Sequence, residues 1–232
     1  MPKEAGGMFP SLLLIFLMSI VILSLVSCRP DNAVTKLDPG YPSDSLPEIH
    51  PWMIKPDGSG PAMWLDRKQS DGRYIREPIN MVIVDRMAGS REDAVNRLTE
   101  AMTRAGFAPR FGHSGGYLGM IGGRRYPQQP DQPDYAFSDC MWAFPNNHCR
   151  LFGPAFYMGA WIWTGSCSRE KGISHDYVSF MVSREKLADA LVRYANATRA
   201  GNMNLGNRMD DATAGTGDHD GFAALLILHG TR

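Results

Sequence analysis

The feature that most constrains this chain is a charge-free apolar run near its N-terminus, from Phe9 to Val26. A helix needs about 20 predominantly apolar residues to cross a bilayer. This run therefore has the length of a short membrane-spanning helix or of a signal-peptide core. Both interpretations predict delivery of the chain to a membrane, and both argue against a protein that stays in the cytoplasm.

The residues at the end of this run favour cleavage and acylation. Leu25-Val26-Ser27-Cys28 resembles the bacterial lipoprotein box, in which the cysteine receives a diacylglyceryl thioether and the chain is cut just before it. The resemblance implies that Cys28 becomes the acylated N-terminus, anchored by about 0.8 kcal/mol for each buried CH₂. The alternatives are an uncleaved signal anchor and a signal cut at another site. Arg29 follows where enteric bacteria use Asp for inner-membrane retention, which slightly favours the outer membrane.

The chain is expected to divide into a signal peptide (1–27), a lipidated cysteine with a flexible tether (28–62) and one folded domain (63–232). Pro, Asp, Ser and Gly dominate the tether, and no helical or strand period persists there. Such composition is typical of an extended linker. Within and just after it, 51–53 and 63–64 are apolar enough to dock on the domain as a strap.

The clearest pattern in the folded part is a strand followed by a helix. Ile79 to Asp85 is a short apolar run, which indicates a buried strand. Ser90 then begins a helix, with Asp93 three residues later as in a capping box. Gly106 ends it, as is typical of a helix C-terminus. The apolar face of this helix contains Ala94, Val95, Leu98, Ala101, Met102 and Ala105.

The second half of the chain predicts more strands than helices. A second helix is expected to begin at Ser183, and a polar loop is expected over 199–220. Because strands follow strands, a mixed or antiparallel sheet with two helices on one face fits better than a doubly wound parallel sheet. The predicted fold class is therefore a single α+β domain. Strands are expected at 151–152, 160–164, 177–182 and 222–228.

The folded part contains five short segments in a fixed order: 79–107, GGRRYPQQPDQPDYAFS at 122–138, HCRLF at 148–152, WTGSCSREKGISH at 163–175 and DGF at 220–222. Their order resembles that in the LssY C-terminal-like domain family of bacteria. Together they lie within residues 75–230. The family usually has Trp where this chain has Phe152, and its Asp-rich stretch after the position of His175 is thinner here. The resemblance implies a fold but no mechanism, because the family's biochemical role is not established.

One motif suggests catalysis. Gly112-His113-Ser114-Gly115-Gly116 matches the G-x-S-x-G elbow of serine hydrolases, and Asp220 and His229 follow downstream. The elbow needs a strand before it and a helix after it. Here Pro109 interrupts the first and glycines interrupt the second. A Gly-rich turn is the simpler interpretation, and Ser114 remains a weak catalytic candidate.

His148, Arg150 and His175 form the main candidate site. His148 and Arg150 are two residues apart, so on a strand they share one face. Arg offers a planar fork for carboxylate or phosphate, and His serves as acid, base or metal ligand. The expected ligand-binding residues are Arg150, His148, His175 and Asp220, with Asp139 and Asp218 as further acidic neighbours and the two histidines as weak catalytic candidates. The alternative is a structural network of hydrogen bonds and ion pairs.

Charge and cysteine usage exclude other classes. The chain has 24 basic and 24 acidic side chains and zero net formal charge, so no nucleic-acid partner is expected. Beyond Cys28 there are three cysteines, Cys140, Cys149 and Cys167. Two of them could pair in an exported protein, but the odd count argues against an essential disulfide. No paired C-x-x-C or H-x-x-x-H spacing is present, so no metal and no cofactor are expected.

These patterns predict a lipid-anchored protein of the bacterial cell envelope, at the periplasmic face of the outer membrane rather than at the inner membrane. Its domain is expected to be a binding module and not an enzyme. The expected partners are the membrane, through acylated Cys28, and an envelope protein or a small anionic ligand. The alternative is an envelope hydrolase that acts on phosphate esters or, through Ser114, as a serine esterase.

Overall fold

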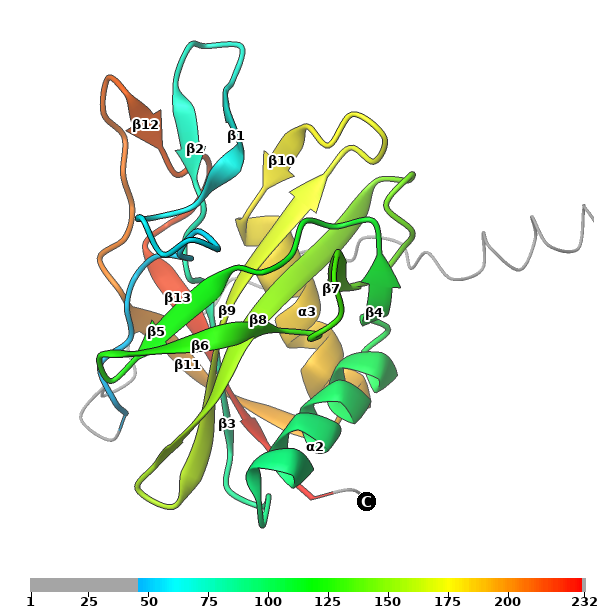
Figure 1. The fold of residues 1–232 in the computed structure, drawn as a ribbon. Helices are drawn as coiled ribbons and strands as arrows, with labels where there is room; N and C mark the ends of the chain where they lie inside the picture. Colours follow the sequence, from blue (N-terminus) through cyan, green and yellow to red (C-terminus); the bar gives the residue numbers. More distant parts are fainter. Residues whose placement is uncertain (1–45, 231–232) are drawn as a thin grey trace, which may run out of the picture.

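The computed structural model describes residues 46–230. Two helices and a strand-rich remainder make one α+β unit, which confirms the predicted fold class (Figure 1). The helices are α2 (Arg91–Arg104) and α3 (Met181–Tyr194). The strands are β1 (Met63–Lys68), β2 (Tyr74–Arg76), β3 (Met81–Asp85), β4 (Ala108–Phe111), β5 (Leu118–Ile121), β6 (Arg124–Gln129), β7 (Tyr135–Ser138), β8 (Asn146–Tyr157), β9 (Ala160–Glu170), β10 (Tyr177–Ser179), β11 (Ala197–Asn204), β12 (Ala214–Gly215) and β13 (Phe222–Leu228).

The main sheet has the strand order β11-β13-β3-β9-β8-β6-β5. β13 and β3 pair in parallel, and the other neighbours along this path pair antiparallel, so the sheet is mixed as expected. β8 and β9 form a long hairpin through its middle. A smaller sheet of β1, β2 and β12 stands beside one end of this hairpin (Figure 1).

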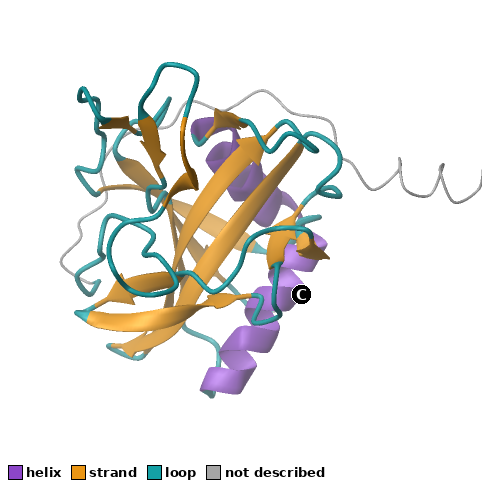
Figure 2. Cartoon of the chain, turned by 45° about the horizontal axis from the view of Figure 1, so that its top comes forward, coloured by secondary structure: helices purple, strands orange, loops and turns teal. Residues whose placement is uncertain are grey.

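Alternate residues of β3 supply two separate cores. Met81 and Ile83 point to one face of the sheet, where both helices pack, and Val82 and Val84 point to the other. The period of two in a strand explains this division. Because both faces are covered, the sequence of β3 reads as one continuous apolar run. Figure 2 shows α2 and α3 on the same side of the sheet, as the sequence predicts.

The second core is covered by chain that the sequence analysis assigned to the tether. Ile49, Met53 and Ile54 are buried, and Ile54 bridges to Leu118 of β5. The folded domain therefore includes the segment from Leu46 onward, and the expected boundary at residue 63 is wrong. Docking of 51–53 as a strap is observed, because Ile79 donates its backbone N–H to Pro51. The proline and glycine content concealed these few apolar contacts.

Both helix starts depend on side-chain caps, and one of the two predicted caps is correct. Ser90 Oγ accepts the backbone N–H of Asp93 at 3.1 Å and begins α2. α3 begins at Met181, so the strand expected to reach residue 182 ends at Ser179 instead. Ser183 lies buried inside α3 and does not cap it. The cap comes from Ser179 and from distant Asp218, whose carboxylate accepts the N–H of Phe180 at 2.8 Å.

The structure bears on two further expectations. The expected polar loop over 199–220 is wrong in its first part, because β11 continues to Asn204 and pairs with β13. Cys149 and Cys167 face each other across β8 and β9 and form a disulfide, so two of the three cysteines do pair. In the described part of the chain, no helix is both long and apolar enough to span a bilayer. The apolar run 9–26 and Cys28 lie outside the described residues.

Candidate functional site

A polar pocket of about 120 Å³ opens at the end of the β8–β9 hairpin where β8 begins. Strands β8 and β9 form its floor, and the β4–β5 and β9–β10 loops and the β1–β2 region form its walls. Most of the titratable groups around it are buried. The lining residues are Trp64, Leu65, Glu77, Gly112, His113, Ser114, His148, Arg150, Glu170 and His175.

The structure brings the predicted set His148, Arg150 and His175 together in this pocket. His148 and Arg150 leave the same face of β8, and Arg150 Nη1 lies 3.2 Å from His148 Nε2. His148 Nδ1 lies 3.2 Å from Asn146 Oδ1, whose own amide nitrogen is engaged as a donor elsewhere. This network assigns the proton of His148 to Nδ1 and leaves a lone pair on Nε2.

Arg150 is held mainly by Ser114 and is only partly free for a ligand. Its Nε donates to the Ser114 carbonyl at 3.1 Å, and its Nη2 donates to Ser114 Oγ at 3.0 Å. Its guanidinium also lies 5.1 Å from the centre of the Tyr117 ring and 3.6 Å from Glu77 Oε2. Among the described residues, no imidazole is hydrogen-bonded to Ser114 Oγ. The elbow motif therefore lies in the pocket without the base that a serine nucleophile needs.

His113 and Glu170 are pocket residues that the sequence analysis did not single out. His113 is 4% exposed. Its Nε2 has no hydrogen-bond partner in the described chain, and its Nδ1 lies 3.8 Å from Glu170 Oε1, too far for a hydrogen bond. The His113 and His148 rings lie 4.5 Å apart. Gly112 makes this placement possible, because a side chain there would overlap Trp142, which folds over the loop.

Glu170 connects the floor of the pocket to its mouth. Its Oε1 accepts a hydrogen bond from Asn146 Nδ2 at 2.8 Å, and its Oε2 lies 2.9 Å from His175 Nδ1. The side chain of His175 is 30% exposed and stacks on Trp142 with ring centres 5.8 Å apart. His175 is therefore the histidine at the entrance, while His113 and His148 lie inside.

Burial sets the charge of the inner groups. It lowers the pKa of His113 to about 3, and nearby Arg150 adds a smaller effect in the same direction. The pKa of His148 is likewise held well below its usual value, first by burial and then by His113 and Arg150. Burial raises the pKa of Glu77, and Arg150 opposes that rise. Both inner imidazoles are thus neutral at pH 7. The lone pair of His148 Nε2 faces Arg150 Nη1 at 3.2 Å and Ser168 Oγ at 3.0 Å, whereas His113 Nε2 has no hydrogen-bond partner in the described chain.

These residues form a potential set of metal ligands. One ligand atom from each of His113, His148 and Glu170 lies within 4.8 Å of the others, and all three side chains are buried. They come from three separate segments of the chain, so no spacing in the sequence reveals them. Two neutral imidazoles and a carboxylate are a common donor set for zinc-type ions.

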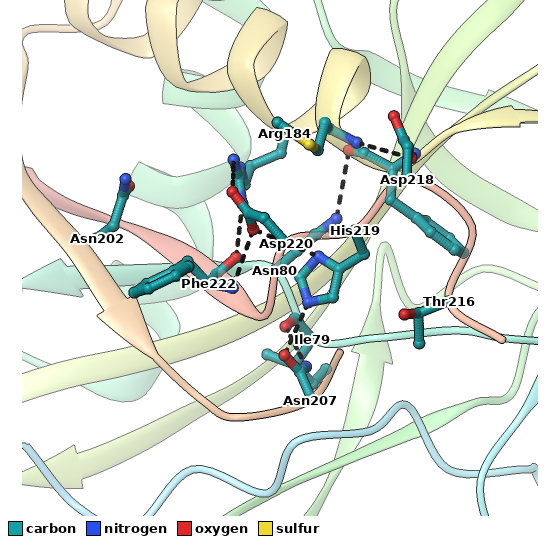
Figure 3. A network of polar contacts seen from close by, with 12 residues as sticks. Ile79, Asn80, Arg184, Asn202, Asn207, Thr216, Asp218, His219, Asp220 and Phe222 are labelled. Carbon is teal, nitrogen blue, oxygen red and sulfur yellow. Dashed lines mark hydrogen bonds and ion pairs between the residues drawn. The ribbon is translucent and has the colours of Figure 1, made fainter. Parts of the chain in front are cut away.

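Asp220 does not join this pocket, against its assignment to the ligand-binding set. Arg184 Nη1 and Nη2 donate to its two oxygens at 2.6 and 2.9 Å, in a separate network near the start of α3 (Figure 3). Asp139 and Asp218 are also absent from the pocket lining. Asp139 accepts from the backbone and side chain of Asn147, and Asp218 caps α3. Each carboxylate already has partners where it lies.

No family model, curated protein or solved structure matches this chain. The resemblance to the LssY C-terminal-like family therefore stays a prediction. The geometry of the pocket carries the functional argument.

Proposed function

We propose that this protein is a membrane-tethered binding module of the bacterial cell envelope whose pocket holds one divalent transition-metal ion. The ligands are His113, His148 and Glu170. The observation that carries the proposal is the buried Nε2 of His113, which has no hydrogen-bond partner in the described chain and belongs to a ring 4.5 Å from that of His148. A buried polar atom without a partner costs about 1–3 kcal/mol, and a bound ion or water in the pocket removes that cost.

The charges in the pocket favour a cation over an anion. Arg150 is the one permanent positive charge among the lining residues, and Glu77 and Glu170 oppose it. Arg150 also uses two of its donor nitrogens on Ser114. When a cation takes the lone pair of His148 Nε2, Arg150 has an alternative partner in Glu77, whose Oε2 lacks a hydrogen bond. A small anion on Arg150 is therefore less well supported than a metal ion.

The donor types select the class of ion. Imidazole suits zinc, copper, iron and nickel, whereas magnesium and calcium prefer oxygen ligands alone. Three protein ligands leave a fourth tetrahedral position open. A volume of about 120 Å³ beside them leaves room for a few water molecules at about 30 Å³ each. The proposed occupant is a zinc-class ion that carries water or a small ligand.

The proposed location depends on the N-terminal sequence. Leu25–Cys28 supports acylation of Cys28, and Arg29 in place of Asp favours the periplasmic face of the outer membrane over the inner membrane. The domain then presents its pocket to the envelope compartment, and its partners are the membrane and the captured ion.

An envelope hydrolase of the metal-dependent kind is the second candidate. The observation that favours it is His175, a partly exposed imidazole at the mouth of the pocket that is paired with Glu170, one of the proposed ligands. A zinc-class ion held by His113, His148 and Glu170 would lower the pKa of a bound water and so could supply a nucleophile for phosphate-ester hydrolysis. A serine esterase is less well supported, because Ser114 is bonded to Arg150 and not to an imidazole.

Calorimetric titration of the purified full chain with Zn²⁺ tests the proposal. We expect one ion per chain. Loss of a residue that only supports a metal ligand lowers the metal affinity about 10–100-fold. We expect His113→Gln and Glu170→Gln, which remove a ligand itself, each to lower the Zn²⁺ affinity by more than this. His229→Gln is the matched control, because His229 is exposed and contacts Thr198 far from the pocket. Thermal melts confirm that each variant is folded.

Two results would contradict the proposal. One is a wild-type chain that binds no zinc-class ion. The other is equal affinity in the His113, Glu170 and His229 variants, because the ion would then sit elsewhere.

A further inference from the structure

The tip of the β8–β9 hairpin lies at the end of the hairpin opposite to β10 (Figure 1). It exposes large apolar side chains, whereas the pocket lies at the other end of the hairpin. Phe156 is 63% exposed, Tyr157 37% and Met158 78%. Met87, in the loop between β3 and α2, is 60% exposed. Apolar residues gathered in this way usually mark a contact with a protein or a membrane.

The tip is held in place by strand pairing, an aromatic contact and a hydrogen bond. Tyr157 pairs with Ala160 across a two-residue turn, and the Phe156 and Trp161 rings lie 4.9 Å apart. Trp161 donates its indole N–H to the Ala88 carbonyl at 3.0 Å, which ties the hairpin to the β3–α2 loop. The two loops therefore present one surface, which we call the apolar tip: 86–91 together with 153–161.

The charge of the apolar tip fits an anionic lipid surface. Its formally charged residues are Arg86 and Arg91, both exposed and both positive. Two acidic residues, Glu92 and Asp93, follow in the first turn of α2, and Asp93 is engaged by the backbone N–H of Gly89. Phospholipid headgroups attract such residues, and aromatic side chains prefer the depth of the headgroups. Two exposed arginines beside Phe, Tyr, Met and Trp side chains are features of an interfacial contact.

The path of the chain brings the apolar tip towards the membrane. The first described residue, Leu46, lines a hollow of about 460 Å³ together with Tyr157 and Met158. The chain thus enters the domain beside the apolar tip. Between Cys28 and Leu46 a flexible linker would have an end-to-end distance of only about 20–25 Å. An anchor at Cys28 therefore holds this end of the domain near the bilayer.

We infer that the apolar tip is a second membrane contact, which inserts Phe156, Tyr157 and Met158 among anionic phospholipid headgroups. The inference rests on the proposed attachment at the N-terminus and not on the metal site. It orients the domain with the pocket facing away from the bilayer.

Fluorescence quenching in vesicles tests this orientation. The full chain carries Met158→Cys with an environment-sensitive label and is reconstituted into phosphatidylethanolamine–phosphatidylglycerol vesicles containing a nitroxide lipid. Ile173→Cys is the matched control, because Ile173 is an apolar residue 72% exposed in the β9–β10 loop at the pocket end. The labelled parent chain gives the background from native cysteines. We expect nitroxide quenching at Met158 at least about threefold stronger than at Ile173, weakened by phosphatidylcholine vesicles and by Phe156→Ser.

Vesicle flotation separates the two ways in which the inference can fail. A chain that floats but shows equal quenching at both labels contradicts the apolar tip as a membrane contact and leaves the attachment intact. A label at Met158 shielded only at high protein-to-lipid ratio, without nitroxide quenching, identifies a second copy as the occupant and also overturns the inference. A chain that does not float contradicts the attachment and the inference together.

Discussion

His219 is a buried imidazole outside the pocket, next to the Arg184–Asp220 pair (Figure 3). Its Nε2 lies 2.7 Å from Asn207 Oδ1, and Asn207 uses its amide nitrogen to donate to two backbone carbonyls. His219 therefore donates from Nε2, and its Nδ1 has no hydrogen-bond partner in the described chain. The neutral ring fits this place, and a second proton does not.

This arrangement predicts a loss of stability in acid. Burial lowers the pKa of His219 from 6.5 to about 4; Arg184 adds to this, while Asp220 and Asp218 oppose it. In the unfolded chain His219 is therefore protonated below about pH 6.5, whereas in the folded chain it stays neutral down to about pH 4. The stability from neutral His219 is complete above pH 6.5 and is lost as the pH falls between these values, by about 2–3 kcal/mol.

Denaturant unfolding of the wild type and of His219→Gln between pH 7 and 4 measures this contribution. Gln keeps a donor for Asn207 but does not titrate. We expect the variant to lose less unfolding free energy over this range than the wild type, although His113 and His148 add their own dependence in both chains. An unchanged slope in His219→Gln would mean that the ring takes up its proton as readily in the folded chain as in the unfolded chain, against the lowered pKa.

The candidate site could be predicted only in part at this scale. The alternation of His148 and Arg150 placed both on one face of a strand, and the pocket contains both. The sequence shows His113 only as part of a Gly-rich motif, and Glu170 only as part of the polar segment after a Trp-rich strand. Neither pattern predicts a site residue. Their role depends on long-range packing across β4–β5 and β9, for which a sequence contains no local signal.

At the scale of elements, the start of α3 shows how a distant residue sets a boundary. Asp218 accepts the N–H of Phe180 at 2.8 Å and the Tyr177 hydroxyl at 2.6 Å. It thus satisfies a free N–H at the helix start and places a negative charge at the positive end of the helix.

Replacement of Asp218 should therefore destabilise the fold. We expect Asp218→Asn to cost less than Asp218→Ala, and the latter to lower the free energy of unfolding by about 1–2 kcal/mol. Ser183→Ala is the control, because Ser183 was the cap expected from sequence and makes only a 3.5 Å contact to the His148 carbonyl. Equal losses in Asp218→Ala and Ser183→Ala by chemical denaturation would refute the assigned cap.

The elements with local signals were predictable and those held by distant partners were not. α2 has its own cap at Ser90 and a clear apolar face, and both were recognised. β3 and β13 are continuous apolar runs and were also recognised. The strands within 107–147 could not be predicted, because they contain Gly, Pro and Arg and depend on pairing with one another and, through β6 and β7, with β8. The segment 46–62 was misassigned for the same reason, since its few apolar residues are buried only by the sheet.

At the scale of the whole molecule, the long β8–β9 hairpin separates two functions that we propose. His148 lies near the start of β8 and Tyr157 at its end, which places the pocket and the apolar tip about 30 Å apart along the strand. The described chain begins beside the apolar tip, so the proposed membrane anchor and the proposed metal site lie at opposite ends of the hairpin. A tethered domain in this orientation would open the pocket with His113, His148 and Glu170 to the envelope compartment and not to lipid.

The central claim is the metal site, and anomalous diffraction at the zinc edge from crystals of the zinc-loaded protein tests it most directly. The account predicts one strong peak at about 2.0–2.2 Å from one nitrogen each of His113 and His148 and from an oxygen of Glu170. It predicts no such peak at these positions in His113→Gln crystals. Wild-type crystals with zinc only on surface side chains, and an empty pocket, would contradict the claim.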